Sequence, residues 1–173
     1  EESGIDFCLG QVAGIDPEKV SSVFLTHSHR DHSGALEVFS SAKILMSKEE
    51  ADYVNDKNNP MHSFFLNLRN GYSTFRDQEI VESGGVKIKA ILCPGHTPGS
   101  TSFLINDSYL FTGDALSIKD GRVELFNAYS DQKKQRESLS NLANNVKARY
   151  VFTGHYGLTD NYEHAFEKWK RRD

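Results

Sequence analysis

The chain has 173 residues, of which 38% are hydrophobic, so residues 1–173 are predicted to form a single soluble domain with a sizeable core. Its formal net charge is −4, and its basic runs are no longer than Lys133–Lys134 and Lys170–Arg172, which argues against a nucleic-acid partner. Because no apolar stretch approaches the roughly 18 residues of a membrane span and two cysteines cannot make a disulfide framework, we expect no membrane partner and a cytoplasmic location.

Short apolar segments alternate with helix-like segments along the whole chain. Strands are predicted where β-branched and aromatic residues cluster, at Ser21–Thr26, Ala42–Ser47, Val86–Cys93, Thr101–Asn106, Ser108–Gly113 and Arg149–Gly154. Helices are predicted at Ser33–Ser40, Lys48–Asp56, Gln132–Val146 and Asn161–Arg171. Residues 105–107 read as a turn between two strands, so part of the sheet is a hairpin. Alternation combined with a hairpin predicts an α/β fold with a mixed sheet.

Two local features refine this reading. Ser47 is a predicted N-cap, because Glu50 follows at the spacing of a capping box. The least regular part of the chain is 52–77, which contains the aromatic residues Phe64, Phe65, Tyr72 and Phe75. This segment is either a helix packed on the core or an aromatic loop over a pocket.

The first predicted strand is followed by an unusual cluster of metal-binding side chains, His27, His29, Asp31 and His32. In an extended chain, His27 and His29 share one face and can grip one metal. Asp31 and His32 fall where the chain turns into the helix predicted to begin near Ser33, so they aim at a different point. The cluster therefore suits two adjacent metals.

Three later predicted strands end in the same way, with Gly followed by a residue that can bind a metal. These residues are His96, Asp114 and His155. In α/β sheets, sites gather beyond the carboxyl ends of strands, so the four strand ends are expected to converge on one cleft. Glycine suits such ends because it tolerates sharp turns and close backbone approach.

The candidates divide into two ligand sets and a bridge. One set is His27, His29 and His96, the other is Asp31, His32 and His155, and Asp114 is placed to bridge them. Three protein ligands with an open position are typical of a catalytic metal site, and a bridging carboxylate suits a metal pair roughly 3.5–4 Å apart. We expect two divalent ions, zinc first, with iron or manganese as alternatives. Asp31 and Asp114 are the candidate catalytic carboxylates.

This arrangement predicts a hydrolase whose nucleophile is a hydroxide held between the two metals. A nucleophilic triad is not favoured, because there is no G-x-S-x-G elbow and the two cysteines, Cys8 and Cys93, sit in apolar contexts. A Gly-His or Gly-Asp pair taken alone is usually a turn, and the first cluster taken alone could be a surface metal scavenger. His62 and His164 lie outside the ligand sets.

The order "THSHRDH", "PGHTPGS", "TGD" and "TGH" resembles the metallo-β-lactamase-fold superfamily from Val23 to about Gly157. The resemblance implies an αββα sandwich with two metals at one edge of the sheets. True β-lactamases commonly carry Cys at the position of Asp114. The branch that resembles hydroxyacylglutathione hydrolases, together with lactonases and tRNA-processing nucleases, carries Asp there. The resemblance to this branch implies cleavage of an ester, thioester or lactone bond in a small-molecule substrate rather than of a β-lactam.

Two other functions remain open. Persulfide dioxygenases of the same fold bind a single iron through residues that match His27, His96 and Asp114, so the resemblance also allows this oxygen chemistry. A third reading is an inactive metal-binding or interaction domain. Pocket candidates are Tyr129 and Tyr156 with the aromatic segment above, and Lys119 or Arg122 for an anionic group.

The front of the chain departs from the resemblance. Members of the superfamily usually begin with several strands before the first motif, and here 26 residues precede His27. We therefore expect an αββα sandwich that lacks the first N-terminal strands. An edge left bare there would favour pairing with a second copy, so a homodimer is an expectation as well.

Overall fold

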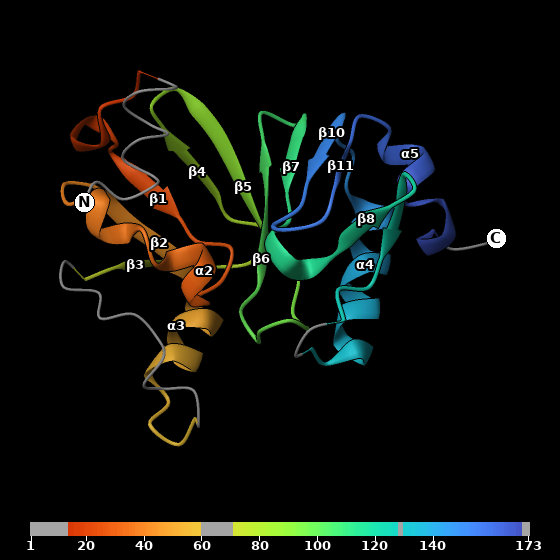
Figure 1. The fold of residues 1–173 in the computed structure, drawn as a ribbon, viewed down its shortest axis with the longest axis horizontal. Coiled ribbons are helices and arrows are strands. Elements are labelled where there is room, and N and C mark those ends of the chain that lie inside the picture. The colour runs from red at the N-terminus through yellow and green to blue at the C-terminus, as the bar shows by residue number, and fades with distance from the viewer. Residues whose placement is uncertain (1–13, 60–70, 128–129, 171–173) are drawn as a thin grey trace.

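The structure, a computed structural model, describes residues 14–59, 71–127 and 130–170. Its elements form four layers: a helix layer, a three-stranded sheet, a six-stranded sheet and a second helix layer (Figure 1). The predicted α/β sandwich is confirmed. Helix α3 (Lys48–Asn55) packs on the smaller sheet, while α4 (Gln132–Asn145) and α5 (Tyr162–Ala165) cover the larger one. No helix in these described ranges is long and apolar enough to cross a membrane.

The three-stranded sheet is entirely parallel, in the order β1–β2–β3. Its strands are β1 (Ser22–Phe24), β2 (Lys43–Ser47) and β3 (Ser73–Phe75). After β1 the chain passes through a loop into the single-turn helix α2 (Arg30–Ser33). This loop and helix carry the first cluster of candidate ligands.

The six-stranded sheet is mixed, as predicted, in the order β11–β10–β7–β6–β5–β4. Its strands are β4 (Ile80–Ser83), β5 (Val86–Leu92), β6 (Thr101–Ile105), β7 (Tyr109–Phe111), β10 (Tyr150–Phe152) and β11 (Leu158–Thr159). The pair β7 and β10 is parallel, so the carboxyl ends of these two strands lie side by side. The predicted hairpin joins β6 to β7 through Asn106 and Asp107, whose φ values of 47° and 54° suit a two-residue turn.

The remaining elements are short. A two-stranded hairpin lies in the chain between β7 and β10, formed by β8 (Ser117–Lys119) and β9 (Arg122–Glu124). Single 3₁₀ turns occur at η2 (Pro17–Lys19), η3 (Leu36–Val38), η5 (Gly113–Ala115) and η6 (Glu167–Trp169). Of these, η5 directly follows β7 and contains Asp114.

Three apolar clusters fill the spaces between the four layers. The largest lies between the six-stranded sheet and the helices α4 and α5, and includes Leu110, Leu139 and Phe166. A second cluster joins the two sheets, where the ring of Phe103 meets the edges of Phe24 and Phe75. A third joins α3 to the smaller sheet. Burial of apolar area between the layers holds the strand ends in place, which positions the loops that follow them.

Several sequence predictions are corrected by the structure. The prediction of a helix at Ser33–Ser40 is wrong: α2 begins three residues earlier and ends at Ser33 with Gly34 as its C-cap, and only the turn η3 follows. The helix predicted at Asn161–Arg171 breaks after Ala165, where the fully buried Phe166 enters the core. Its last residue, Arg171, lies outside the described ranges. The helices at Lys48 and Gln132 are confirmed, as is Ser47 as the N-cap of α3.

The segment 52–77 was predicted to be either a helix packed on the core or an aromatic loop over a pocket, but its described residues contain the end of α3 and the strand β3, which was not predicted. Within it, Phe75 is 1% exposed and belongs to the core between the sheets. Cys93 is also buried, as expected, and burial raises the pKa of its thiol to about 12. The side chains of Cys8, His62, Phe64, Phe65 and Tyr129 lie outside the described residues.

Candidate metal centre

The first group of candidate ligands is placed by the turn between β1 and α2. Directly after β1, Leu25 still donates its N–H to the carbonyl of Leu45 in the neighbouring strand. The chain leaves the sheet beyond this bond. The hydroxyl of Ser33 donates to the carbonyl oxygens of Ser28 and His29, at 2.9 and 2.8 Å. These bonds fold the segment back on itself, so that the side chains before and within α2 face the same space.

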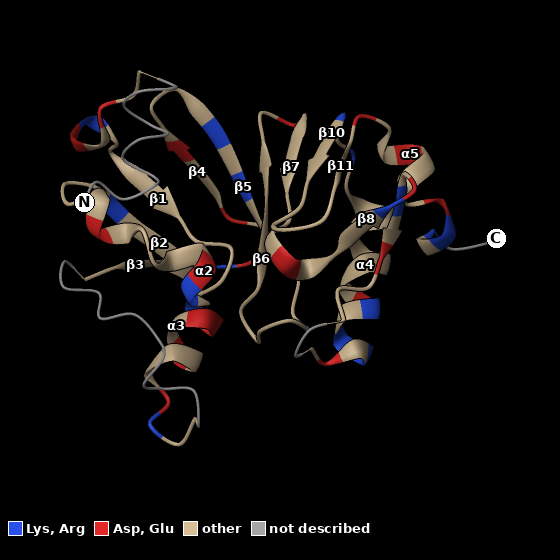
Figure 2. Cartoon of the chain, in the orientation of Figure 1, with Lys and Arg blue, Asp and Glu red and all other residues tan. Residues whose placement is uncertain are grey.

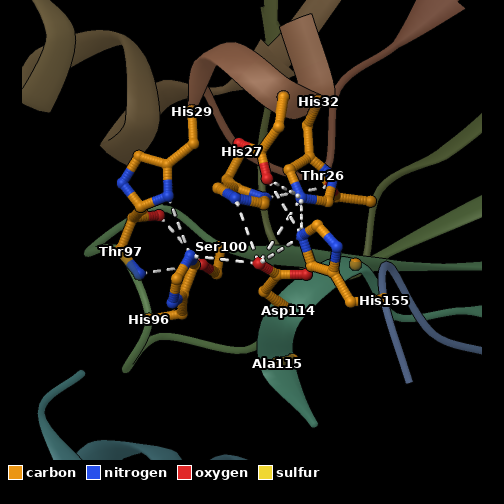
Figure 3. A network of polar contacts seen from close by, with 12 residues as sticks. Thr26, His27, His29, His32, His96, Thr97, Ser100, Asp114, Ala115 and His155 are labelled. Atoms are coloured by element: carbon orange, nitrogen blue, oxygen red, sulfur yellow. Dashed lines mark hydrogen bonds and ion pairs between the residues drawn. The ribbon is translucent and has the colours of Figure 1, made fainter. Parts of the chain in front are cut away.

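The other ligands come from the ends of three strands of the six-stranded sheet. His96 follows β5, Asp114 lies in η5 after β7, and His155 follows β10. The loops after β7 and β10 are joined by a hydrogen bond of 2.9 Å from the Gly154 N–H to the Gly113 carbonyl. The predicted convergence of four strand ends is therefore present in the fold, and Figure 3 shows the side chains turned toward one another.

At two of the positions directly before a candidate ligand, the structure leaves no room for a side chain larger than that of glycine. Gly113 has a φ of +51°, and a Cβ there would lie 2.5 Å from the Thr26 hydroxyl. A Cβ on Gly154 would lie 2.2 Å from Asp114 Oδ1 and 2.7 Å from the His32 ring. Any larger residue at either position would displace a side chain of the site.

The ligands form an inner and an outer group. The inner group is His27, His29 and His96, whose nitrogens lie within 4.8 Å of one another, and His96 Nε2 is 2.8 Å from His29 Nδ1. The outer group is Asp31, His32 and His155, grouped by the same criterion. In it, His155 Nε2 lies 2.9 Å from Asp31 Oδ2 and 3.1 Å from His32 Nε2. Figure 2 shows acidic residues in red on α2 and on the turn that follows β7.

Asp114 lies between the two groups and is 4% exposed. Its Oδ2 atom is 3.4 Å from the Nε2 atoms of both His96 and His32. The same oxygen is 3.5 Å from His155 Nε2 and 3.9 Å from His27 Nε2. One carboxylate oxygen thus faces imidazoles of both the inner and the outer group, as expected of a bridging ligand.

Two buried atoms at this centre have no hydrogen-bond partner among the described residues, His27 Nε2 and Asp114 Oδ1. Buried polar atoms are nearly always paired, and an orphan of this kind often marks an ion site. Metal coordination would satisfy both atoms. Because the donors are imidazoles and carboxylates gathered in groups of three, the set fits zinc, iron or manganese.

The electrostatics favour an imidazole ready to bind a metal. Burial, followed by the neighbouring imidazoles, lowers the pKa of His27 to about 2, so this ring is neutral and keeps a free lone pair. Thr26 Oγ1 lies 3.2 Å from His27 Nδ1, which leaves Nε2 directed into the centre. For His32, burial lowers the pKa, but the hydrogen bond and charge of Asp114 outweigh it and raise the pKa overall.

Asp31 behaves differently from the buried Asp114. Burial would raise the pKa of Asp31, but a backbone hydrogen bond and the neighbouring His32 and His155 lower it overall. Its side chain is 57% exposed and forms its ion pairs with these two histidines. Asp31 is therefore an ionised carboxylate at the mouth of the centre.

Of the remaining sequence candidates, Tyr156 lies beside the candidate ligands, whereas His164, Lys119 and Arg122 lie elsewhere. The ring of Tyr156 is 5.9 Å from that of His155. His164 is exposed on α5, where its backbone bonds to Asn161 and Arg122 and not to a candidate ligand. Lys119 and Arg122 line a cavity of about 940 Å³ together with Trp169, and no member of the ligand groups lines it.

Sequence reasoning did not identify two residues that contact the centre. The ring of Phe126 packs against His96 at 5.1 Å and His155 at 6.0 Å, which makes it an apolar wall of the site. Glu50 lies behind the inner group and accepts hydrogen bonds from the residues beside its histidines. No local signal marks Phe126, whereas the buried Glu50 was read only as part of a helix cap.

Comparison with known families agrees with this geometry. Residues 8–155 match the family described as the metallo-beta-lactamase superfamily. The chain belongs to this superfamily. The resemblance seen in the sequence motifs is thereby confirmed, and the match includes every member of both ligand groups.

Named relatives include hydrolases. The chain is 27% identical over 157 residues to the probable polyketide biosynthesis zinc-dependent hydrolase PksB of Bacillus subtilis, covering 84% of this chain and 64% of that protein. It is 28% identical over 150 residues to a hydroxyacylglutathione hydrolase of Glaesserella parasuis, covering 84% of this chain and 55% of that protein. The chain thus spans between half and two thirds of the length of these relatives.

A solved structure shows the same fold. The metallo-beta-lactamase family protein TTHA1429 of Thermus thermophilus matches with a TM-score of 0.72 and 24% identity, over 95% of this chain and 64% of that one. The chain therefore spans about two thirds of the length of this neighbour.

Proposed function

We propose that this domain is a metal-dependent hydrolase that cleaves an ester, thioester or lactone bond in a small molecule with the help of two divalent metals. The observation that carries the proposal is the position of Asp114, whose Oδ2 lies within 3.4 Å of one imidazole from each ligand group. A carboxylate in this position would hold two ions close together. The names of PksB and of the hydroxyacylglutathione hydrolase relative support the same class of reaction.

The inner group would hold one ion and the outer group the other, with Asp114 shared between them. Two such ions supply a water of lowered pKa as nucleophile and a Lewis acid that polarises the substrate carbonyl. No other nucleophile is needed, and the buried thiol of Cys93 is unsuited to the role because its pKa is raised to about 12.

The protein would orient the metal-binding side chains and shield one side of the centre from water with an apolar ring. Thr26 directs His27 Nε2 into the centre, and the burial of His27 keeps its imidazole neutral. Phe126 packs on His96 and His155, so the apolar part of a substrate would lie against this ring. Asp31 is exposed at the mouth, where its carboxylate lies 2.9 Å from His155 Nε2 and would share the outer ion with that histidine.

The test combines elemental analysis with a substrate panel. Purified protein is analysed for zinc, iron and manganese, and is then assayed with ester, thioester, lactone and persulfide substrates. We expect about two zinc ions per chain and turnover of at least one carbonyl substrate. A protein that holds one iron and consumes oxygen with a persulfide, while hydrolysing nothing in the panel, would overturn the proposal in favour of the dioxygenase. A protein that binds metal but turns over nothing would favour a binding domain.

A further inference from the structure

Glu50 is a carboxylate in the first turn of α3 with an exposed fraction of 0%. Its Oε1 atom accepts hydrogen bonds from the N–H and the hydroxyl of Ser28, at 2.8 and 2.6 Å. Its Oε2 atom accepts a hydrogen bond of 2.6 Å from the Thr97 hydroxyl. Buried carboxylates are rare unless they are paired, and this one is held by polar hydrogens from two separate loops.

The partners of Glu50 are adjacent in sequence to every member of the inner group. Ser28 stands between His27 and His29, and Thr97 directly follows His96. One side chain therefore joins the loop after β1 to the loop after β5, where these three histidines lie. None of the hydrogen bonds of Glu50 reaches a residue next to Asp114 or His155.

The contacts around Glu50 leave it little freedom to move. The Ser47 hydroxyl accepts the Glu50 N–H at 3.0 Å and donates to the Gly99 carbonyl at 2.7 Å. A Cβ on Gly99 would lie 2.0 Å from the Glu50 nitrogen, so the loop after β5 is pressed directly onto the start of α3. The Thr97 hydroxyl also lies 2.9 Å from the Ser100 hydroxyl, which fixes its direction.

We propose that Glu50 is a positioning residue that holds the inner group in its metal-binding geometry and gives this group a higher metal affinity than the outer group. The inference rests on the proposed function, because it assumes that both groups bind metal. Its physical basis is that hydrogen bonds behind the ligands fix their orientation before a metal arrives. Loss of such supporting partners typically lowers metal affinity about 10–100-fold.

The experiment titrates zinc into the metal-free chain against a chromophoric chelator, for the wild type and for Glu50→Gln. Glutamine has the same shape, but its amide group cannot accept from both Ser28 and Thr97. We expect the tighter zinc site to weaken about 10–100-fold, with the weaker site unchanged. The matched control is Glu49→Gln, which removes the same charge from the same helical turn at an exposed position and should leave both sites unaltered.

A second pair of variants tests the route through Thr97 without touching the buried charge. Thr97→Val removes the hydroxyl and should weaken the same zinc site, whereas Thr97→Ser keeps the hydroxyl and should restore it. Circular dichroism and thermal melting of each metal-free variant separate loss of affinity from loss of fold. A cobalt-loaded sample adds a visible spectrum that reports ligand geometry independently of activity.

The outcomes distinguish this inference from the proposed function. If Glu50→Gln and Thr97→Val fold and bind zinc like Glu49→Gln, Glu50 does not position the inner group. If both sites weaken equally, Glu50 acts on the fold as a whole and the inference is also wrong. A wild type that binds two zinc ions yet hydrolyses nothing would refute the proposed function alone, because the affinity ratio between the variants would still be measurable.

Discussion

The inner and outer ligand groups sit a few ångströms apart but are built differently. His27 and His96 are 0% and 7% exposed, and the inner group is backed by Thr26, Ser28 and Thr97. In the outer group, the side chains of Asp31 and His155 are 57% and 38% exposed. Among the described residues, the polar contacts of these two side chains are with each other, with His32 and, for His155, with Asp114.

The difference in burial predicts that the two groups differ in metal affinity. Because the inner group is held by the core, we expect its geometry to form before any ion binds. The outer group lies at the surface, on the single-turn helix α2 and the loop after β10, where fewer buried contacts restrict motion. We expect metal to fill the inner group first and to leave it last.

The largest expected effect comes from the residue that serves both groups. Asp114→Ala removes the shared carboxylate and leaves the facing imidazoles without an anion, so metal content should fall from two towards one or less. Hydrolysis should drop by roughly 10³-fold, equivalent to about 4 kcal/mol of transition-state stabilisation. Metal analysis and kcat/KM on the best panel substrate measure both losses. A variant that keeps two metals and normal turnover would contradict the bridging role.

A comparison of His96→Ala with His155→Ala tests the difference between the groups directly. Each variant loses a ligand and should lose at least about 10²-fold in activity, since even supporting partners contribute up to this much to metal affinity. The metal content should differ. His155→Ala should retain one tightly bound ion in the inner group, whereas His96→Ala should hold its remaining ion weakly. Equal retention under dialysis against a chelator would show that the two groups are energetically alike.

A smaller effect is expected from a residue that offers no ligand atom. Gly154→Ala would place a methyl group 2.2 Å from Asp114 Oδ1, so the bridge must move. We expect about a tenfold to hundredfold loss of activity, the range for disturbed supporting positions, with the metal-free melting temperature little changed. The control is Gly121→Ala in the β8–β9 turn, where a Cβ has no neighbour within 4 Å. It should strain its local backbone but leave activity intact, and equal losses in both variants would rule out the steric explanation.

The smallest effect is expected from a histidine outside the ligand groups. His164 is exposed on α5, and its hydrogen bonds to other described residues use only its backbone N–H and carbonyl. His164→Ala should leave metal content and activity unchanged, and stability within about 0.5 kcal/mol, as is usual for surface substitutions. Thermal melting and metal analysis are sufficient, and loss of a metal would place His164 in the centre after all.

The candidate metal-binding residues could be identified from the sequence alone. They follow short apolar runs enriched in β-branched and aromatic residues, and such runs favour strands. The carboxyl ends of neighbouring strands then bring the residues together. Helices α3 and α4 were also predictable, since Ser47 and Asp131 cap them by local hydrogen bonds. These features depend on residues close together in the chain.

Only the tertiary structure decided the rest. Strands β8 and β9 each have one apolar residue between two polar ones, and they form because their backbones pair with each other. The helix predicted from Asn161 breaks because Phe166 enters the core and the Trp169 indole donates to the Val123 carbonyl. Glu50 belongs to the same class, because a capping pattern describes its backbone but its side chain bonds to residues 22 and 47 positions away. Contacts over such separations are fixed by packing, which no local pattern encodes.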